Sequence, residues 1–510
     1  MWAKHTLASR YPSGPMASTG VPKGPNVVLV VLDTLTARAA ALSDDPPPMP
    51  GLAHLAQRGA TFSHAVSNAP WTYPSHASLL TGLLPSEHGM DTPHQFTGWE
   101  LDDPTGRSLQ ALLPPGPAAN PVVGPRWLPA LLAAAGYETA CVSNNPWVGR
   151  LTGMEVGFHR LRDPLAVRLA GWRSAFRARP RLRSALRAGY NTYRAMIGGG
   201  DLLAADAVRL VRSWTDRRDR SRPFFLLVNL IEAHAPYLTP LTPRALRELR
   251  ARPGPVLRAM RLLEPRWTIR YNLGDPAYRL TGGALRVGRA LHETSARYLD
   301  TIVTELHEIA AGQGRDVLTC VTSDHGESFG EHGSLLHGFT LDEETLHVPL
   351  VVSGGGVPAG DHHDTVDLRR VYATLLEAVG LAVPEGAAPS LLDSERGVAV
   401  AERERLDLPA WADIDRPLAR ARVGRIRAAY RDPWKLVATD AGTSLFDRSS
   451  DPGERVDLAG ERPDVRRELE AMLPAWPDQP SPGPRPDTGE LTEAEERELT
   501  DRLAALGYVE

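Results

Sequence analysis

Cysteine is almost absent from the sequence. Only two cysteines, Cys141 and Cys320, occur among 510 residues, and each lies in an apolar run typical of a buried strand. Two cysteines cannot form the framework of several disulfides that holds small secreted domains together. The sequence therefore predicts two buried, unpaired thiols, and the length of the chain allows it to bury a large hydrophobic core.

Long apolar segments are missing as well. The two strongest runs, NVVLVVL (26–32) and PFFLLVNLI (223–231), are far shorter than the roughly 20 residues that a membrane-spanning helix needs. The N-terminal residues 1–24 contain no apolar core of a secretory signal. These absences predict a cytoplasmic protein without a membrane span.

The charge is small overall but unevenly distributed. The formal net charge is −4, yet residues 160–187 hold nine arginines and one acid, and residues 244–279 hold nine arginines and three acids. Such segments suit an anionic small-molecule ligand. The alternative is a helical lid whose arginines are only solvated. Aromatic residues in these segments are too few to indicate nucleic-acid binding.

Strand and helix patterns alternate through the first three quarters of the chain. The continuous apolar runs 26–32, 223–231 and 317–322 are typical of buried parallel strands, and residues 290–311 carry apolar side chains at helical spacing. This alternation predicts an α/β fold in which a central, mostly parallel mixed sheet lies between helices.

The pattern changes at about residue 380, where short strand patterns with tight turns begin. They predict a small C-terminal α+β subdomain. We therefore divide the chain into a disordered leader (1–24), a main domain with the two arginine-rich insertions (25–378), the subdomain (379–475), and a proline-rich linker with a terminal helix (476–510).

Acidic residues and a histidine directly follow two of the predicted strands. Asp33 follows the first apolar run, and Asp324 and His325 follow the run at 317–322. Ligands in open α/β sheets bind at the carboxyl ends of strands. Two carboxylates and an imidazole suit a divalent cation, and Mn²⁺, Zn²⁺, Mg²⁺ and Ca²⁺ are all compatible with them. Asn144 and Asn145 also follow a strand and could contact the substrate, but we favour the interpretation that they cap their loop.

A threonine completes this candidate site. The stretch APWTYPSHASLLTG (69–82) predicts a helix capped by Ser75, with Thr72 in the turn before it. A helix N-terminus offers unpaired N–H groups and a positive dipole end, which suit a phosphate or sulfate group. A cation bound to the Thr72 hydroxyl would lower its pKa and make it a nucleophile, so Thr72 is a candidate metal ligand as well.

Five separated segments resemble those of the sulfatases, a family within the alkaline phosphatase superfamily. They are NVVLVVLDTL, APWTYPSHASLLTGLLPSEHG, EAHAPY, TSDHGESFGEHG and LDEETLHVPLVV, in the order and rough spacing of that family. Residues 432–465 are similar to the sulfatase C-terminal subdomain. The resemblance covers about residues 25–475. It implies the alkaline-phosphatase-like fold and a metal-dependent ester hydrolase.

The chain departs from the family at the position of its modified residue. Sulfatases have a Cys-x-Pro-Ser-Arg core whose cysteine, or sometimes serine, is oxidised to formylglycine, whereas this chain has Thr72-Tyr73-Pro74-Ser75-His76. The doubled aspartate of the family is Asp33-Thr34 here, so one metal ligand is absent. Threonine is not a recognised substrate of that oxidation. The chain therefore resembles the threonine-nucleophile members of the superfamily, which favours phosphate or phosphonate esters over sulfate esters.

Three histidines are candidates for protonating the leaving oxygen. His234 in EAHAPY matches the substrate-contacting histidine of the family, and His337 falls near a lysine or histidine of its members. His76 is the third candidate, with a position on the helix surface as its alternative. A histidine near its reference pKa can act as an acid near neutral pH.

The resemblance thus implies a hydrolase of anionic small-molecule esters that uses Thr72 as its nucleophile. Two alternatives stay open. One is a phosphoryl-group transferase that uses the same threonine intermediate, and the other is a catalytically inactive binding protein with the sulfatase fold.

Overall fold

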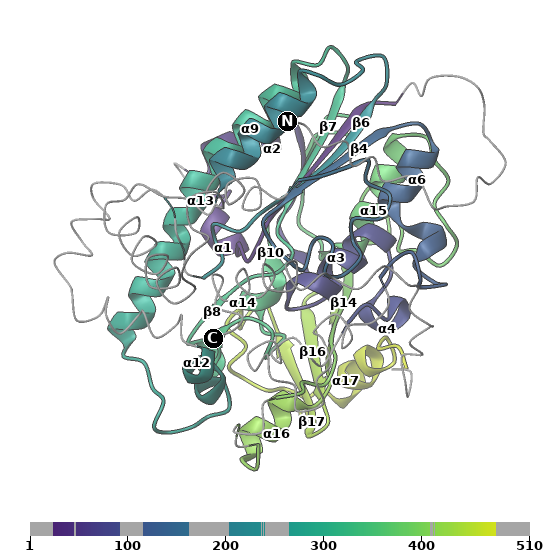
Figure 1. Cartoon of the computed structure of the whole chain (residues 1–510). Helices are drawn as coiled ribbons and strands as arrows, with labels where there is room; N and C mark the ends of the chain where they lie inside the picture. Colours follow the sequence, from purple (N-terminus) through teal and green to yellow (C-terminus); the bar gives the residue numbers. More distant parts are fainter. Residues whose placement is uncertain are drawn as a thin grey trace.

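The computed structural model describes most of the two predicted domains. The described residues are 24–44, 47–91, 116–162, 203–235, 237, 239, 265–408, 412 and 414–475. The predicted leader up to residue 23, the segment 476–510 and most of the two arginine-rich insertions lie outside the described residues. Figure 1 shows a large sheet between two layers of helices and a smaller sheet at one end of the molecule.

The centre of the main sheet is β1 (Asn26–Leu32), the first predicted apolar run, which is buried along its whole length. Val27 and Val31 belong to one apolar cluster, while Val28 and Leu32 belong to another on the opposite face. Successive side chains of a strand point to opposite faces, so a strand covered on both sides is apolar at almost every position. This explains why the run is continuous rather than alternating.

The main sheet has eight strands in the order β12-β2-β11-β7-β1-β6-β4-β5. Five neighbours are mutually parallel: β7 (Val317–Thr322), β1, β6 (Phe224–Leu230), β4 (Glu138–Ser143) and β5 (Arg160–Arg162). The antiparallel strand β11 (Leu350–Ser353) joins them to β2 (Gly59–Phe62) and β12 (Gly360–His362). The predicted fold, a central and mostly parallel mixed sheet, is confirmed.

Helices cover both faces of this sheet (Figure 1). One layer contains α1 (Ala37–Ala40), α2 (Pro50–Gln57), α9 (Ala204–Thr215) and α13 (Gly282–Ala311). The other contains α3 (Thr72–Thr81), α6 (Leu128–Ala134) and α15 (Arg369–Ala378). Cys141 and Cys320 are buried and unpaired, as predicted. No helix in the described ranges combines the length and the apolar content that crossing a bilayer requires.

Several short elements connect the main sheet to the rest of the structure. A three-stranded sheet contains β3 (Ala65–Val66), β10 (His347–Val348) and β13 (Val366–Asp367), and a hairpin contains β8 (Ser328–Phe329) and β9 (Leu335–Leu336). The short helices are α4 (Pro85–His88), α12 (Pro265–Asn272), α14 (Glu343–Leu346) and α16 (Pro417–Val423), with 3₁₀ turns at Gly124–Arg126 and Glu331–Gly333.

The smaller sheet is antiparallel and follows the main one in sequence. It contains β14 (Val398–Arg403), β15 (Ile426–Arg431), β16 (Trp434–Thr439) and β17 (Gly442–Asp447), with α17 (Pro463–Glu470) packed against it. Leu469 of α17 lies in one apolar cluster with Leu436 and Leu445. The chain up to Leu391 still packs in the core of the main sheet.

A buried lysine joins the small sheet to helix α14. Lys435 of β16 is fully buried, and its Nζ lies 3.1 Å from Glu343 Oε1 of α14 and 2.5 Å from Glu454 Oε1. Burial alone would raise the pKa of Glu343, but the cations of Lys435 and Arg448 outweigh it and lower that pKa to about 2. Because a buried charge is costly unless it is paired, this network fixes how the small sheet sits against α14.

Replacing the buried lysine should destabilise the protein strongly. We expect Lys435→Ala to lower the free energy of unfolding by about 3–5 kcal/mol, because it breaks the buried ion pairs of Glu343 and Glu454 with the lysine. Urea unfolding measures the change. The matched control is Arg431→Ala on the neighbouring strand, whose ion pair with Glu468 is half exposed, and its effect should stay below about 1 kcal/mol. Equal losses in the two variants would contradict the role of the network.

Candidate active site

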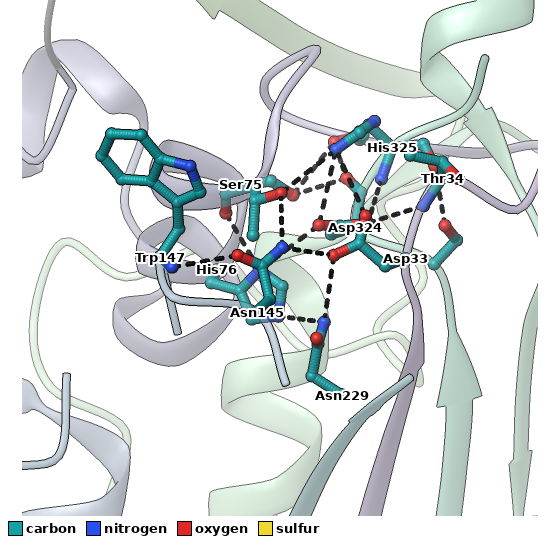
Figure 2. Close-up of polar contacts among 12 residues, drawn as sticks. Asp33, Thr34, Ser75, His76, Asn145, Trp147, Asn229, Asp324 and His325 are labelled. Carbon is teal, nitrogen blue, oxygen red and sulfur yellow. Dashed lines mark hydrogen bonds and ion pairs between the residues drawn. The ribbon is translucent and has the colours of Figure 1, made fainter. Parts of the chain in front are cut away.

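The loops after β1 and β7 bring the predicted metal ligands together. These two strands are parallel neighbours, with Val31 opposite Thr322, so Asp33 and Asp324 leave the sheet at the same edge. The ligand atoms of Asp33, Asp324 and His325 all lie within 4.8 Å of one another, and all three residues are buried. Figure 2 shows the three side chains facing one another.

His325 directs a lone pair toward both carboxylates. Its Nδ1 lies 3.0 Å from the carbonyl oxygen of Gly326 and therefore donates, which leaves Nε2 without a proton. Burial lowers the pKa of His325 to about 3, so the ring is neutral. Nε2 lies 3.9 Å from Asp33 Oδ1 and 3.5 Å from Asp324 Oδ2. Within the described part of the chain, neither oxygen has a hydrogen-bond partner.

These three atoms fit a divalent cation. Two carboxylate oxygens and an imidazole lone pair that face one another in a buried site repel each other, and a bound cation would relieve that repulsion. The other oxygen of Asp324, Oδ1, accepts hydrogen bonds from the backbone N–H groups of Thr34 (3.2 Å) and His325 (3.0 Å), which orient the carboxylate. Mn²⁺, Zn²⁺, Mg²⁺ and Ca²⁺ accept such ligands.

Thr72 is the first residue of α3 rather than part of a turn before it. The helix cap is Trp71, and the predicted cap at Ser75 is therefore wrong. Ser75 instead donates its hydroxyl to the backbone carbonyl of Asp324 (2.6 Å), which ties the helix to the metal-ligand loop. Pro74 is accepted in the first turn because its missing N–H would have no helical partner there.

The Thr72 hydroxyl lies against the metal-ligand set. Thr72 is buried, and its Oγ1 lies 3.5 Å from Nε2 of His325 and 3.3 Å from Nδ2 of Asn145. The four residues that the sequence singled out as candidate ligands therefore converge on one site, at the carboxyl edge of the central strands and at the start of α3.

Two asparagines that the sequence analysis did not assign to the site also belong to it. Asn145, after β4, donates through Nδ2 to Asp33 Oδ2 at 2.7 Å, and Asn229, near the end of β6, donates to the same oxygen at 3.4 Å. Asn145 does cap its loop, because its Oδ1 accepts a hydrogen bond from the backbone N–H of Trp147. Its Nδ2 contacts the site at the same time. For Asn229, the signal in the sequence was a single polar residue near the end of an apolar strand.

His76 is buried beneath the start of α3, so its alternative position on the helix surface is wrong. Its Nδ1 donates to the carbonyl of Thr72 at 2.9 Å and lies 3.5 Å from Asp324 Oδ2. Its Nε2 lies 3.4 Å from Nδ2 of Asn229, which donates to it (Figure 2). His76 thus contacts the backbone of Thr72 and two other residues of the site.

His337 lies next to the candidate metal ligand His325, and His234 lies next to His337. The ring centroid of His337 is 4.5 Å from that of His325 and 5.0 Å from that of His234. His337 Nδ1 lies 2.7 Å from Glu327 Oε1, and Tyr237 donates its hydroxyl to the other oxygen of Glu327 at 3.2 Å. Burial lowers the pKa of His337 to about 3 and raises that of Glu327 to about 7. The structure thus brings both predicted histidines to the site and adds Glu327 beside them.

Comparison with known proteins identifies the family. A sequence model of the sulfatases matches residues 25–381. The chain belongs to the sulfatase family. Arylsulfatase K of Rattus norvegicus is 24% identical over 486 residues, which cover 89% of this chain and 78% of that protein. Choline-sulfatase of Rhizobium meliloti is 26% identical over 463 residues, 85% of this chain and 82% of that protein. With arylsulfatase K of Bos taurus the match is 30% over 190 residues, and it spans about a third of both chains.

Solved sulfatase-like structures share the fold. The phosphonate monoester hydrolase of Agrobacterium radiobacter superposes with a TM-score of 0.61 at 19% identity, over 88% of this chain and 94% of that one. A 2-O GAG sulfatase superposes with a TM-score of 0.60 at 16% identity, over 88% and 91% of the two chains. At such identities the likeness concerns the fold, and it agrees with the alkaline-phosphatase-like architecture predicted from the sequence.

The second departure from the sulfatase pattern, Thr34, holds the site together through its backbone. Thr34 has a φ of 64°, a left-handed conformation that is uncommon for threonine. Its N–H donates to Asp324, and its carbonyl accepts a hydrogen bond from Nε2 of the buried His292 at 3.0 Å. The strained turn therefore links the loops after β1 and β7 where the family has its second aspartate.

Neutralising one candidate ligand should abolish cation binding and stabilise the metal-free protein. In Asp324→Asn the remaining Oδ1 keeps both backbone contacts, while an uncharged NH2 group replaces Oδ2, the buried oxygen that has no hydrogen-bond partner in the described residues. We expect a higher melting temperature without metal. Mn²⁺ at 100 times its Kd should add about 2.7 kcal/mol to the stability of the wild type and nothing to that of the variant.

The control for this variant is Asp300→Asn. Asp300 is also buried and accepts backbone hydrogen bonds, from Gly51 and Leu52, but it lies on α13 away from the candidate ligands. The variant Asp300→Asn should have a lower melting temperature than the wild type, and Mn²⁺ should stabilise it as much as it stabilises the wild type. A Mn²⁺ response in Asp324→Asn equal to that of the wild type would refute the assignment of this ligand.

Proposed function

We propose that the protein is a metal-dependent hydrolase of phosphate, phosphonate or sulfate esters that uses Thr72 as its nucleophile. The observation that carries the proposal is the position of Thr72 Oγ1, 3.5 Å from His325 Nε2, at a site whose two carboxylates fit a cation. Membership of the sulfatase family supports ester hydrolysis. The threonine, in place of an oxidisable cysteine or serine, supports a hydroxyl as the attacking group.

Asp33, Asp324 and His325 would hold the cation, with Thr72 beside them. When bound, the cation supplies Lewis-acid chemistry, which draws negative charge away from the ester oxygens and from the hydroxyl. The chain itself contributes the N-terminus of α3, whose first backbone N–H groups have no helical partner and favour an anionic group there.

The reaction consists of two displacements at phosphorus or sulfur. In the first, Thr72 passes its proton to a basic group of the enzyme, Oγ1 forms a bond to the phosphorus or sulfur atom, and the ester bond to the alcohol oxygen breaks. The alcohol leaves with a proton donated by the enzyme. In the second, water attacks the same atom, the bond to Oγ1 breaks, and Thr72 regains a proton. One ester and one water thus give one alcohol and one acid.

His337 and His234 are our candidates for protonating the alcohol, because His337 lies beside a candidate metal ligand and His234 lies beside His337. Burial keeps His337 neutral in the free protein, and a bound anion beside it would favour its protonated form. We assign His76 a different part. Its contacts with the backbone of Thr72, with Asp324 and with Asn229 suit a residue that holds the nucleophile in place.

We infer that the preferred esters carry a single negative charge. Sulfate esters and phosphonate monoesters, the substrates named in choline-sulfatase and in phosphonate monoester hydrolase, both have one ionised group. Among the described residues, the side-chain partners of Asp33, Thr72 and Asp324 are amides and histidines rather than lysine or arginine. A singly charged ester therefore matches this part of the site better than a doubly charged one.

The nucleophile can be tested by substitution at Thr72. We expect Thr72→Ala to lower kcat by about three to six orders of magnitude on an aryl phosphodiester, phosphonate or sulfate with Mn²⁺. Thr72→Ser should keep part of the activity, because serine retains the oxygen. Intact-protein mass spectrometry of the wild type should show an unmodified threonine that gains a substrate-derived group after rapid quenching.

Thr81→Ala is the control for this test. Thr81 lies in the last turn of the same helix, where its hydroxyl donates to the carbonyl of Ala77, and its loss should leave kcat within about threefold of the wild type. Full activity in Thr72→Ala would mean that water attacks directly. A wild type that binds the esters without turning any of them over would instead support a binding protein.

A further inference from the structure

The amide of Asn145 touches the nucleophile and a candidate metal ligand at the same time. Its Nδ2 lies 2.7 Å from Asp33 Oδ2 and 3.3 Å from Thr72 Oγ1. An amide nitrogen carries two hydrogens, so it can donate one to each oxygen. Asn229 provides the comparison within the same site, because it also donates to Asp33 Oδ2 but has its second contact with His76 instead of Thr72.

The orientation of the Asn145 amide is fixed by its other end. Its Oδ1 accepts a hydrogen bond from the backbone N–H of Trp147 at 2.9 Å, and its own backbone N–H donates to Ser143 Oγ at 3.1 Å. An exchange of the amide nitrogen and oxygen would place the amide oxygen, an acceptor, against the carboxylate oxygen of Asp33 and leave the N–H of Trp147 facing a donor. The donor end therefore faces the site, as Figure 2 shows.

The Asn145 loop is packed against the start of α3. The ring of Trp147 lies 5.3 Å from that of Trp71 and 6.3 Å from that of Tyr73, the two residues that flank Thr72 in the chain. All of these side chains are buried. This packing holds the amide and the nucleophile at a constant separation, so the donor does not have to reorganise during the reaction.

The hydrogen bond from the uncharged Asn145 amide to Thr72 Oγ1 affects how readily that oxygen gives up its proton. A hydrogen bond to Oγ1 is stronger when that oxygen carries negative charge, so it favours the form of Thr72 that has lost its proton. An amide nitrogen is not a base and cannot take up that proton itself. The interaction thus acts on the step in which the hydroxyl attacks rather than on the binding of the ester.

We propose that Asn145 is a further catalytic residue, which donates a hydrogen bond to Thr72 Oγ1 and stabilises that oxygen as it gives up its proton at the start of the attack on the ester. This inference rests on the proposed function, because it requires Thr72 to be the nucleophile. Its second hydrogen bond, to Asp33, keeps the amide in place and links the nucleophile to the metal-ligand set.

The test compares Asn145→Ala with Asn229→Ala. Both remove a donor to Asp33, but only the first removes a donor to Thr72. We expect Asn145→Ala to lower kcat by about 10²–10³-fold, the usual effect of losing one hydrogen-bond donor to a developing oxyanion, with KM changed by less than about threefold. Asn229→Ala should lower kcat by less than about tenfold.

Two further measurements separate catalysis from a structural role. Mn²⁺ affinity, measured without ester by competition with a chelating dye, should fall to a similar extent in both variants, because both lose a contact to Asp33. Rapid-quench mass spectrometry should show the adduct on Thr72 forming more slowly only in Asn145→Ala. If Asn145→Ala does not fold, the same measurements can be made on Asn145→Ser. Serine can still accept from the N–H of Trp147, as in ST-turns, but its shorter side chain does not reach Thr72.

The outcomes distinguish this inference from the proposed function. If the wild type forms the Thr72 adduct and Asn145→Ala loses no more activity than Asn229→Ala, Asn145 acts only through Asp33 and the inference is overturned. If the wild type forms no adduct and Thr72→Ala stays active, the proposed function itself fails.

Discussion

The active site depends on one unfavourable arrangement: two buried carboxylates and the lone pair of a neutral imidazole face one another. In the described residues, Asp33 Oδ1 and Asp324 Oδ2 have no hydrogen-bond partner, and His325 Nε2 lies within 4 Å of both. Such a cluster is costly, so the surrounding structure has to hold it in place, and a bound cation would stabilise it. The strained turn at Thr34 and the contact of Ser75 with the Asp324 backbone are parts of that support.

The parallel sheet explains how residues so far apart in sequence come to share this cluster. The strands β7, β1, β6 and β4 are neighbours, and each carries a polar residue at or just beyond its carboxyl end. These residues are Asp324, Asp33, Asn229 and Asn145. Because parallel strands end at the same edge, a polar residue there is brought next to those of its neighbours. The apolar strands place the site, and the residues that follow them give it its chemistry.

The start of α3 shows where local sequence signals mislead. Serine is a favoured helix cap, so Ser75 was a reasonable prediction from the sequence. Its hydroxyl instead donates to the carbonyl of Asp324, a residue 249 positions away. This partner is supplied by the tertiary structure, and the helix consequently begins at Thr72. The shift makes the nucleophile part of the helix N-terminus rather than of a separate turn.

Most strands and helices of this protein, and the chemical types of its site residues, can be predicted from local patterns in the chain. Continuous apolar runs specify strands buried on both faces, and Asp33, Thr72, Asp324 and His325 could be named because they follow such strands or begin a helix. The remaining contacts of the site depend on how distant segments of the chain pack together. Strand order and register brought Asn145 and Asn229 to Asp33, and helix packing buried His76 beneath Thr72. These contacts join segments separated by more than 100 residues or depend on which face of a helix is covered, and no local pattern encodes that information.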